Sequence, residues 1–142
     1  MLKDIKYLIA SYLTEKDILS VFCKSRFEKI LKTYKVTNLN INTACLNGEL
    51  YTVKYLFKKG FTPLQMFIDV TTILGLLDLV RFLESANLIP TRGAINDACA
   101  NGHFLVVKYL FEKEIRPTIL GLDNARRNGH LEIIDYLQDK GY

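Results

Sequence analysis

The sequence predicts an all-α fold in which four helix–turn–helix units stack into an elongated solenoid. One observation is a glycine-centred segment that recurs at a constant interval, as "NGELYTVKYLFKKG", "LGLLDLVRFLESAN", "NGHFLVVKYLFEKE" and "NGHLEIIDYLQDKG". A second is that apolar residues on both sides of this glycine are spaced three apart, which is a helical offset. A third is physical: a single pair of short helices cannot bury its own apolar face, so repeated pairs must stack on one another.

The repeat divides the chain into an N-terminal helical segment and four units. With the glycine as the fifteenth position, the units span residues 34–60, 61–87, 88–114 and 115–141, and residues 1–33 precede them. Each unit is expected to begin with a helix. Pro63, Pro90 and Pro117 recur at the same interval as the glycine, and we place them in the first turn of that helix, where a missing N–H is not needed.

Each unit is expected to contain two short helices joined by the glycine. The first helix should bury two recurring positions, namely Ile41, Ile68, Ile95 and Leu122, and Ala44, Thr71, Ala98 and Ala125. The glycine should end it in the left-handed conformation, which a residue without Cβ adopts at little cost. The second helix should bury Val53, Val80, Val107 and Ile134, and Leu56, Leu83, Leu110 and Leu137.

Composition is typical of one small intracellular domain. The chain has 142 residues, of which 49% are hydrophobic and 24% charged, enough apolar material for a core. Cys45 and Cys99 lie two units apart, roughly 20 Å if layers are about 10 Å thick, which is beyond disulfide reach. Free thiols favour a reducing compartment, and we expect the cytoplasm. Charged residues interrupt the opening "MLKDIKYLIASYL" too early for a signal peptide or a membrane span.

The second half of each unit resembles the ankyrin repeat. The closest segment, "ARRNGHLEIIDYLQDKG" at residues 125–141, is similar to the family pattern A–x–x–G–H–L–E–V–V–x–L–L–L–x–x–G. Ankyrin units have about 33 residues and a T-P-L-H tetrapeptide, whereas these have 27 and carry "LNIN", "MFID", "GAIN" or "LGLD" at that place. The resemblance implies a protein-binding array without projecting hairpins, which binds through its helix surfaces. Shortened units of this kind are most similar to ankyrin arrays of large DNA viruses and amoebal hosts, which would imply the host cytoplasm.

Residues 1–33 resemble an F-box. The similarity lies in "SYL" at 11–13, "DIL" at 17–19 and "CKSRF" at 23–27, in the family's order. It implies docking to the Skp-type linker of a cullin ubiquitin ligase, with the array holding the substrate. The residues that would contact the linker are Leu2, Ile5, Leu8, Ile9, Leu13, Ile18 and Leu19. The alternative is a helical cap that covers the apolar face of the first unit.

Catalysis and metal binding are not predicted. His103 and His130 occupy equivalent positions, but Glu49 and Leu76 stand there in the other units, and no Cys or carboxylate joins both histidines at ligand spacing. We interpret these imidazoles as bridges between the turns of neighbouring units. No Ser/His/Asp order or phosphate-binding glycine loop is present. We therefore expect a monomeric, non-enzymatic protein that has no cofactor.

Nucleic-acid binding is the alternative of a different class. Residues 1–60 carry eleven Lys/Arg against five Asp/Glu, whereas residues 61–142 carry eight against ten. However, Lys54, Lys58 and Lys59 are expected on the solvated side of one helix without interleaved base-stacking aromatics. The equivalent aromatic positions, Tyr55, Phe82, Tyr109 and Tyr136, are expected to form a packing stripe.

The second unit has an unusual apolar face. If Ile68, Thr71 and Thr72 face inward, helical geometry places apolar residues on the opposite, exposed side. An exposed apolar patch of several side chains usually marks a partner site. The predicted contact surface consists of Leu39, Leu46, Met66, Val70 and Ile73, with Asn42 and Asp69 at its rim. The alternative is that the N-terminal helices or an altered helix tilt bury these residues.

Overall fold

The computed structural model describes residues 38–142, with side chains from Ile41 onward. This part of the chain is all-α, as predicted, and consists of helices joined by short turns. The helices are α4 (Asn38–Leu46), α5 (Leu50–Lys58), α6 (Gln65–Ile73), α7 (Leu77–Ser85), α8 (Arg92–Ala100), α9 (Phe104–Glu112), α10 (Ile119–Asn128) and α11 (Leu131–Asp139). Within this range, no helix is long and apolar enough to cross a membrane.

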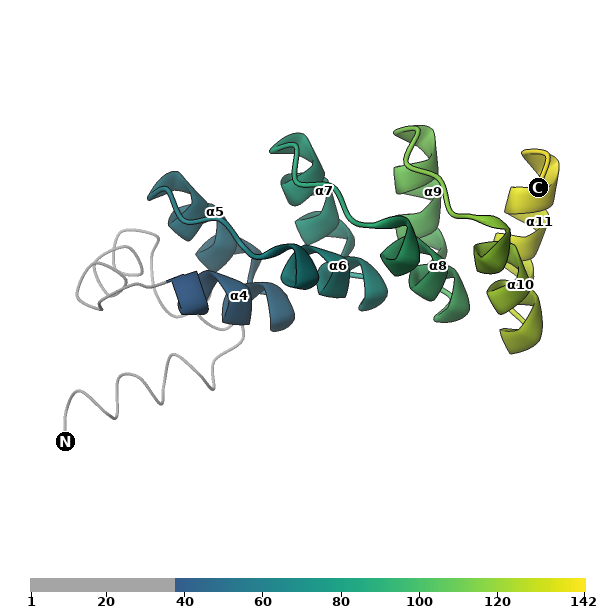
Figure 1. Cartoon of the computed structure of the whole chain (residues 1–142), viewed down its shortest axis with the longest axis horizontal. Coiled ribbons are helices and arrows are strands. Elements are labelled where there is room, and N and C mark those ends of the chain that lie inside the picture. The colour runs from purple at the N-terminus through teal and green to yellow at the C-terminus, as the bar shows by residue number, and fades with distance from the viewer. Residues whose placement is uncertain (1–37) are drawn as a thin grey trace.

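The helices are arranged as four pairs in a row. The first helices of the pairs (α4, α6, α8 and α10) start at the constant interval of the sequence repeat, and so do the second helices (α5, α7, α9 and α11). Figure 1 shows the first helices side by side along one edge of the molecule and the second helices along the other. Each helix packs on its own partner and on the equivalent helix of the neighbouring pair. The exposed face of one first helix is therefore continuous with that of the next.

The glycine between the two helices of a pair adopts the predicted left-handed conformation. Gly48, Gly75, Gly102 and Gly129 have φ angles between 72° and 78°. Two of them are also crowded by the following pair: a Cβ on Gly75 would lie 2.5 Å from the ring of His103, and one on Gly102 would lie 2.7 Å from the ring of His130. At these two turns glycine is required both by the backbone conformation and by the close approach of an imidazole.

The core lies between the two rows of helices and runs from pair to pair. The predicted positions of the first helices are buried in every pair, as are the leucine positions of the second helices. Of the predicted valine and isoleucine positions of the second helices, Val53, Val80 and Val107 are buried, and Ile134 in the last pair is half-buried. The helical spacing read from the sequence therefore identified the inward-facing side of each helix except α11, in which Ile133 and Leu137 are buried.

The prolines do not lie where we expected. The helices α6, α8 and α10 begin two residues after Pro63, Pro90 and Pro117, so these prolines precede the first turn. The intervening residues, Leu64, Thr91 and Thr118, have extended backbone and act as N-caps. Their backbone N–H groups donate to side chains of the preceding pair, which keeps these residues out of the helix. The prolines are buried and hold φ fixed in the connecting segment.

Candidate protein interface on the first helices

The side of α6 that faces away from the core is apolar. Ile68, Thr71 and Thr72 are buried, as predicted, and the Thr71 hydroxyl donates to the carbonyl of Ile68 at 2.7 Å. On the opposite side, Met66 is 61% exposed, and Val70 and Ile73 are half-buried. The second pair therefore presents methyl and thioether groups to solvent.

The apolar surface continues onto the neighbouring helix and ends at the third pair. Leu46, at the end of α4, is 49% exposed, and Leu74, directly after α6, is exposed as well. We call Leu46, Met66, Val70, Ile73 and Leu74 the apolar face. The side chain of Leu39, which was predicted to belong to it, lies outside the described residues. In α8 the positions equivalent to Met66, Val70 and Ile73 are Gly93, Asp97 and Ala100.

Asn42 is not a residue of an exposed rim, and this part of the prediction is wrong. Its side chain is only 5% exposed. Its Oδ1 accepts a hydrogen bond of 3.0 Å from the backbone N–H of Leu64, the N-cap of α6. The residue is buried because it satisfies a backbone donor of the next pair that the helix itself cannot use. Asn42 therefore holds two pairs together and is not available to a partner.

The same contact recurs along the row. Asp69 Oδ1 accepts from the N–H of Thr91 at 2.8 Å, and its Oδ2 accepts from the Thr91 hydroxyl at 3.0 Å. Asn96 Oδ1 accepts from the N–H of Thr118 at 2.9 Å, and its amide donates to the Thr118 hydroxyl at 2.9 Å. We call Asn42, Asp69 and Asn96 the capping column. Asp69 is half-buried at the edge of the apolar face, and its carboxylate is committed to this contact.

The histidines lie between the turns of neighbouring pairs, as interpreted from the sequence. His130 Nε2 lies 2.8 Å from the carbonyl oxygen of Ala100, to which it donates, and the Asn128 amide donates to the same oxygen at 2.6 Å. The Asn101 amide makes the equivalent bond to the carbonyl of Ile73 at 3.1 Å. Among residues 38–142, no three His, Cys, Asp or Glu side chains come together as a metal site.

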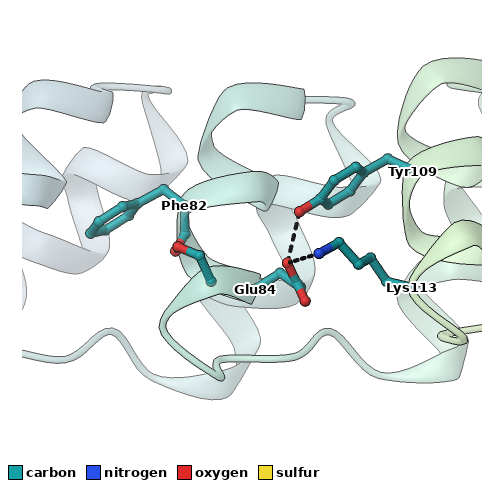
Figure 2. A network of polar contacts seen from close by, with 5 residues as sticks. Phe82, Glu84, Tyr109 and Lys113 are labelled. Carbon is teal, nitrogen blue, oxygen red and sulfur yellow. Dashed lines mark hydrogen bonds and ion pairs between the residues drawn. The ribbon is translucent and has the colours of Figure 1, made fainter.

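The second helices are joined by aromatic and polar contacts that follow the repeat. Phe57 packs edge-on against Phe82 at 5.5 Å between ring centroids, and Phe111 packs against Tyr136 in the same way at 5.6 Å. At the equivalent place between the second and third pairs, the Tyr109 hydroxyl donates to Glu84 Oε2 at 2.7 Å. Figure 2 shows Tyr109 and Lys113 converging on this carboxylate, with Lys113 Nζ 3.7 Å away. These aromatic side chains therefore form a packing stripe.

The Tyr109 contact makes stability depend on pH in the alkaline range. Burial, together with the hydrogen bond to Glu84 and the charge of Glu84, raises the pKa of Tyr109 to about 12, whereas an unfolded tyrosine titrates near 10. The contribution of the neutral Tyr109 side chain to the free energy of unfolding is therefore fully present below pH 10 and is lost as the pH rises through about 12. We expect urea unfolding to show the wild type as more stable than Tyr109→Phe at pH 8, with a smaller difference at pH 11. A difference that is the same at both pH values would contradict this assignment.

The described cysteines are inert structural residues. Cys45 and Cys99 are buried free thiols. Burial raises the pKa of Cys45 to about 11 and that of Cys99 to about 12, so both remain protonated at neutral pH, and it is the thiolate that reacts. Cys45 in α4 and Cys99 in α8 fill the core on the inward side of these first helices.

The predicted linker-binding residues lie outside the described part of the chain, namely Leu2, Ile5, Leu8, Ile9, Leu13, Ile18 and Leu19. Among the described residues, the apolar face is the surface that brings together most of the predicted partner-binding side chains. Comparison with models of known protein families, with curated proteins and with solved structures finds no match to this chain.

Proposed function

We propose that this chain is a non-enzymatic protein-binding module, an ankyrin-like solenoid of shortened units whose first helices dock another protein. The observation that carries the proposal is the apolar face. A single exposed leucine is ordinary on a protein surface, but here exposed and half-buried apolar side chains share the outer side of α6 and the end of α4, which packs against it. Such contiguous patches mark interaction sites.

The apolar face is a property of this sequence and is not imposed by the fold. Helix α8 occupies the same place in the next pair and packs against α6. Nevertheless, it has the exposed Asp97 where α6 has Val70. In α10 the exposed Arg127 stands at the position of Ile73. Because equivalent positions accept polar residues, the apolar ones in the first two pairs point to a partner.

Nucleic-acid binding through the basic residues of α5 is less well supported. Lys54 Nζ lies 5.6 Å from the centre of the Phe82 ring, and Lys59 Nζ lies 5.6 Å from the centre of the Tyr55 ring. Stacking of bases requires free aromatic faces, and here the chain's own cations occupy them. Titration with duplex DNA at rising salt tests this alternative, since phosphate contacts would give a steep loss of affinity with salt.

We also propose that residues 1–33 bind a second kind of partner. Through them the protein would serve as a substrate adaptor of a cullin-type ubiquitin ligase. This part of the proposal rests on the F-box resemblance. The full chain and its Leu8→Asp, Ile9→Asp double variant can be compared by affinity capture and mass spectrometry. Ligase subunits that are captured by the wild type alone support the adaptor role, whereas the same subunits in both samples, or none in either, count against it.

The apolar face is tested most directly by Val70→Asp. A charge at its centre should abolish capture of the proteins bound through this face, because binding would have to desolvate the carboxylate. The free energy of unfolding should change by no more than about 0.5 kcal/mol, as for other surface substitutions.

The matched control is Lys54→Asp, which places the same side chain on the exposed side of α5. Affinity capture with the full chain and both variants should lose partners only for Val70→Asp. If Val70→Asp and the wild type capture the same proteins, the face is not the docking site. A large loss of stability would show instead that Val70 belongs to the core.

A further inference from the structure

The third pair carries a glycine that the fold does not require. Gly93 is the second residue of α8, at the position of Met66 in α6 and Leu120 in α10. A Cβ added there would meet only the Thr91 hydroxyl, at 3.7 Å. Gly93 is also not among the glycines of positive φ. Glycine within a helix is less stable than alanine, so neither packing nor backbone conformation accounts for its presence.

The missing side chain leaves a notch in the row of first helices. Its two flanks are apolar, since Met66 and Leu120 are both largely exposed. Asp97 lies four residues after Gly93, which places it on the same side of α8, about 6 Å further along the axis. Its carboxylate is exposed and has no ion pair among the described residues. The neighbouring Arg92 lies roughly 140° away around the helix.

We propose that this notch, which we call the Gly93 notch, receives a lysine or arginine side chain of the protein partner. The inference rests on the proposed function. The aliphatic stem of such a side chain would lie between Met66 and Leu120, and its cationic group would reach Asp97. Lysine and arginine combine an apolar stem with a charged end, and this pairing matches the two flanks and the carboxylate.

The position of the Gly93 notch defines the partner segment more closely. Helix α8 packs beside α6, so Gly93 lies one helix diameter, about 10 Å, from the helix that carries Val70 and Ile73, and Met66 lies between the notch and these residues. A docked segment therefore presents apolar side chains to the first two pairs and a basic side chain one pair further along. The carboxylate of Asp97 disfavours a phosphate backbone, so the occupant is a protein segment and not a nucleic acid.

The experiment selects random twelve-residue displayed peptides in parallel on the full chain and on its variants. Wild type should enrich peptides with apolar residues and one Lys or Arg at a constant spacing from them. Asp97→Lys should enrich Asp or Glu at that spacing instead. A peptide selected on wild type should bind Asp97→Lys and Gly93→Leu about tenfold or more weakly, as expected for loss of a charge-assisted contact.

Controls separate failure of this inference from failure of the proposed function. Asp78→Lys makes the same change at an exposed residue of α7 and should leave peptide binding unchanged. Peptides that are lost with Val70→Asp but bind equally to wild type and Asp97→Lys overturn the basic-residue inference alone.

If the selected peptides bind Val70→Asp and Asp97→Lys as tightly as wild type, or if no peptides are enriched at all, both the proposed docking face and the basic-residue inference are overturned. A further variant, Ile5→Asp with Ile9→Asp, tests occupation by the chain's own N-terminal segment. Enrichment on this variant but not on wild type would show that residues 1–33 cover the face and would overturn the notch as a partner site. Circular dichroism of each variant establishes that it is folded.

Discussion

Truncation of Leu110 to alanine is expected to lower the free energy of unfolding by about 2–5 kcal/mol. Leu110 is fully buried in a cluster with Val80, Ile95 and Val106. These residues come from the second and third pairs, so the cavity would open between neighbouring pairs. Since each pair depends on its neighbours for burial, the loss should appear in urea unfolding followed by circular dichroism at 222 nm.

The same substitution on the exposed side of the helix is the control. Leu105 lies on α9 as well but is 64% exposed, so Leu105→Ala removes the same atoms with the same change of helix propensity. Its effect should stay within about 0.5 kcal/mol. Similar losses for the two variants would mean that burial at Leu110 does not stabilise the contact between pairs.

Replacement of Gly121 by alanine is expected to destabilise the protein by about 1–3 kcal/mol through overpacking. A Cβ at Gly121 would lie 2.8 Å from Pro117 Cβ, 2.9 Å from Asn96 Oδ1 and 3.3 Å from Cys99 Sγ. None of these is the free end of a flexible side chain. The insertion must therefore push α10 away from α8 and stretch the hydrogen bonds between Asn96 and Thr118.

Gly93→Ala provides the comparison, because it is the same change within a helix where a Cβ would make only an ordinary van der Waals contact, 3.7 Å from the Thr91 hydroxyl. It should leave the melting temperature unchanged or raise it slightly, since alanine is the better helix former. Thermal unfolding of both variants beside the wild type gives the measurement. A destabilisation by Gly93→Ala comparable to that by Gly121→Ala would refute the assigned difference in packing.

Much of the fold could be predicted because its signals are local. The left-handed turn at Gly75 follows from the absence of a Cβ, and the inward side of α6 follows from the spacing of Ile68, Thr71 and Thr72. Both signals recur at a fixed interval along the chain, so each position could be checked against its equivalents. The exposed side of α6 was then found by geometry, as the side opposite to the buried one.

The capping column was missed because its partners are distant in sequence. Asn42 and Asp69 bond to backbone groups 22 residues further on, and a polar residue beside an apolar patch was taken for part of its rim. A signal was present, since "LNIN", "MFID" and "GAIN" occupy equivalent places in their units and all end in Asn or Asp. The difference between Gly93 and Gly121 left no such trace, because it depends on how closely two helices approach each other.

The capping column also bears on how such a chain can change its length during evolution. In each case the acceptor is a side chain, but the donor is a main-chain N–H, supplied by Leu64, Thr91 or Thr118 alike. A duplicated segment of one repeat length therefore brings its own acceptor and finds a backbone donor in whichever segment follows it. After a deletion, the preceding acceptor finds a donor in the next remaining segment in the same way. The only requirement is that the residue at the donor position is not proline. The capping contact therefore survives the gain, loss or exchange of a segment without a matching mutation in the neighbouring segment.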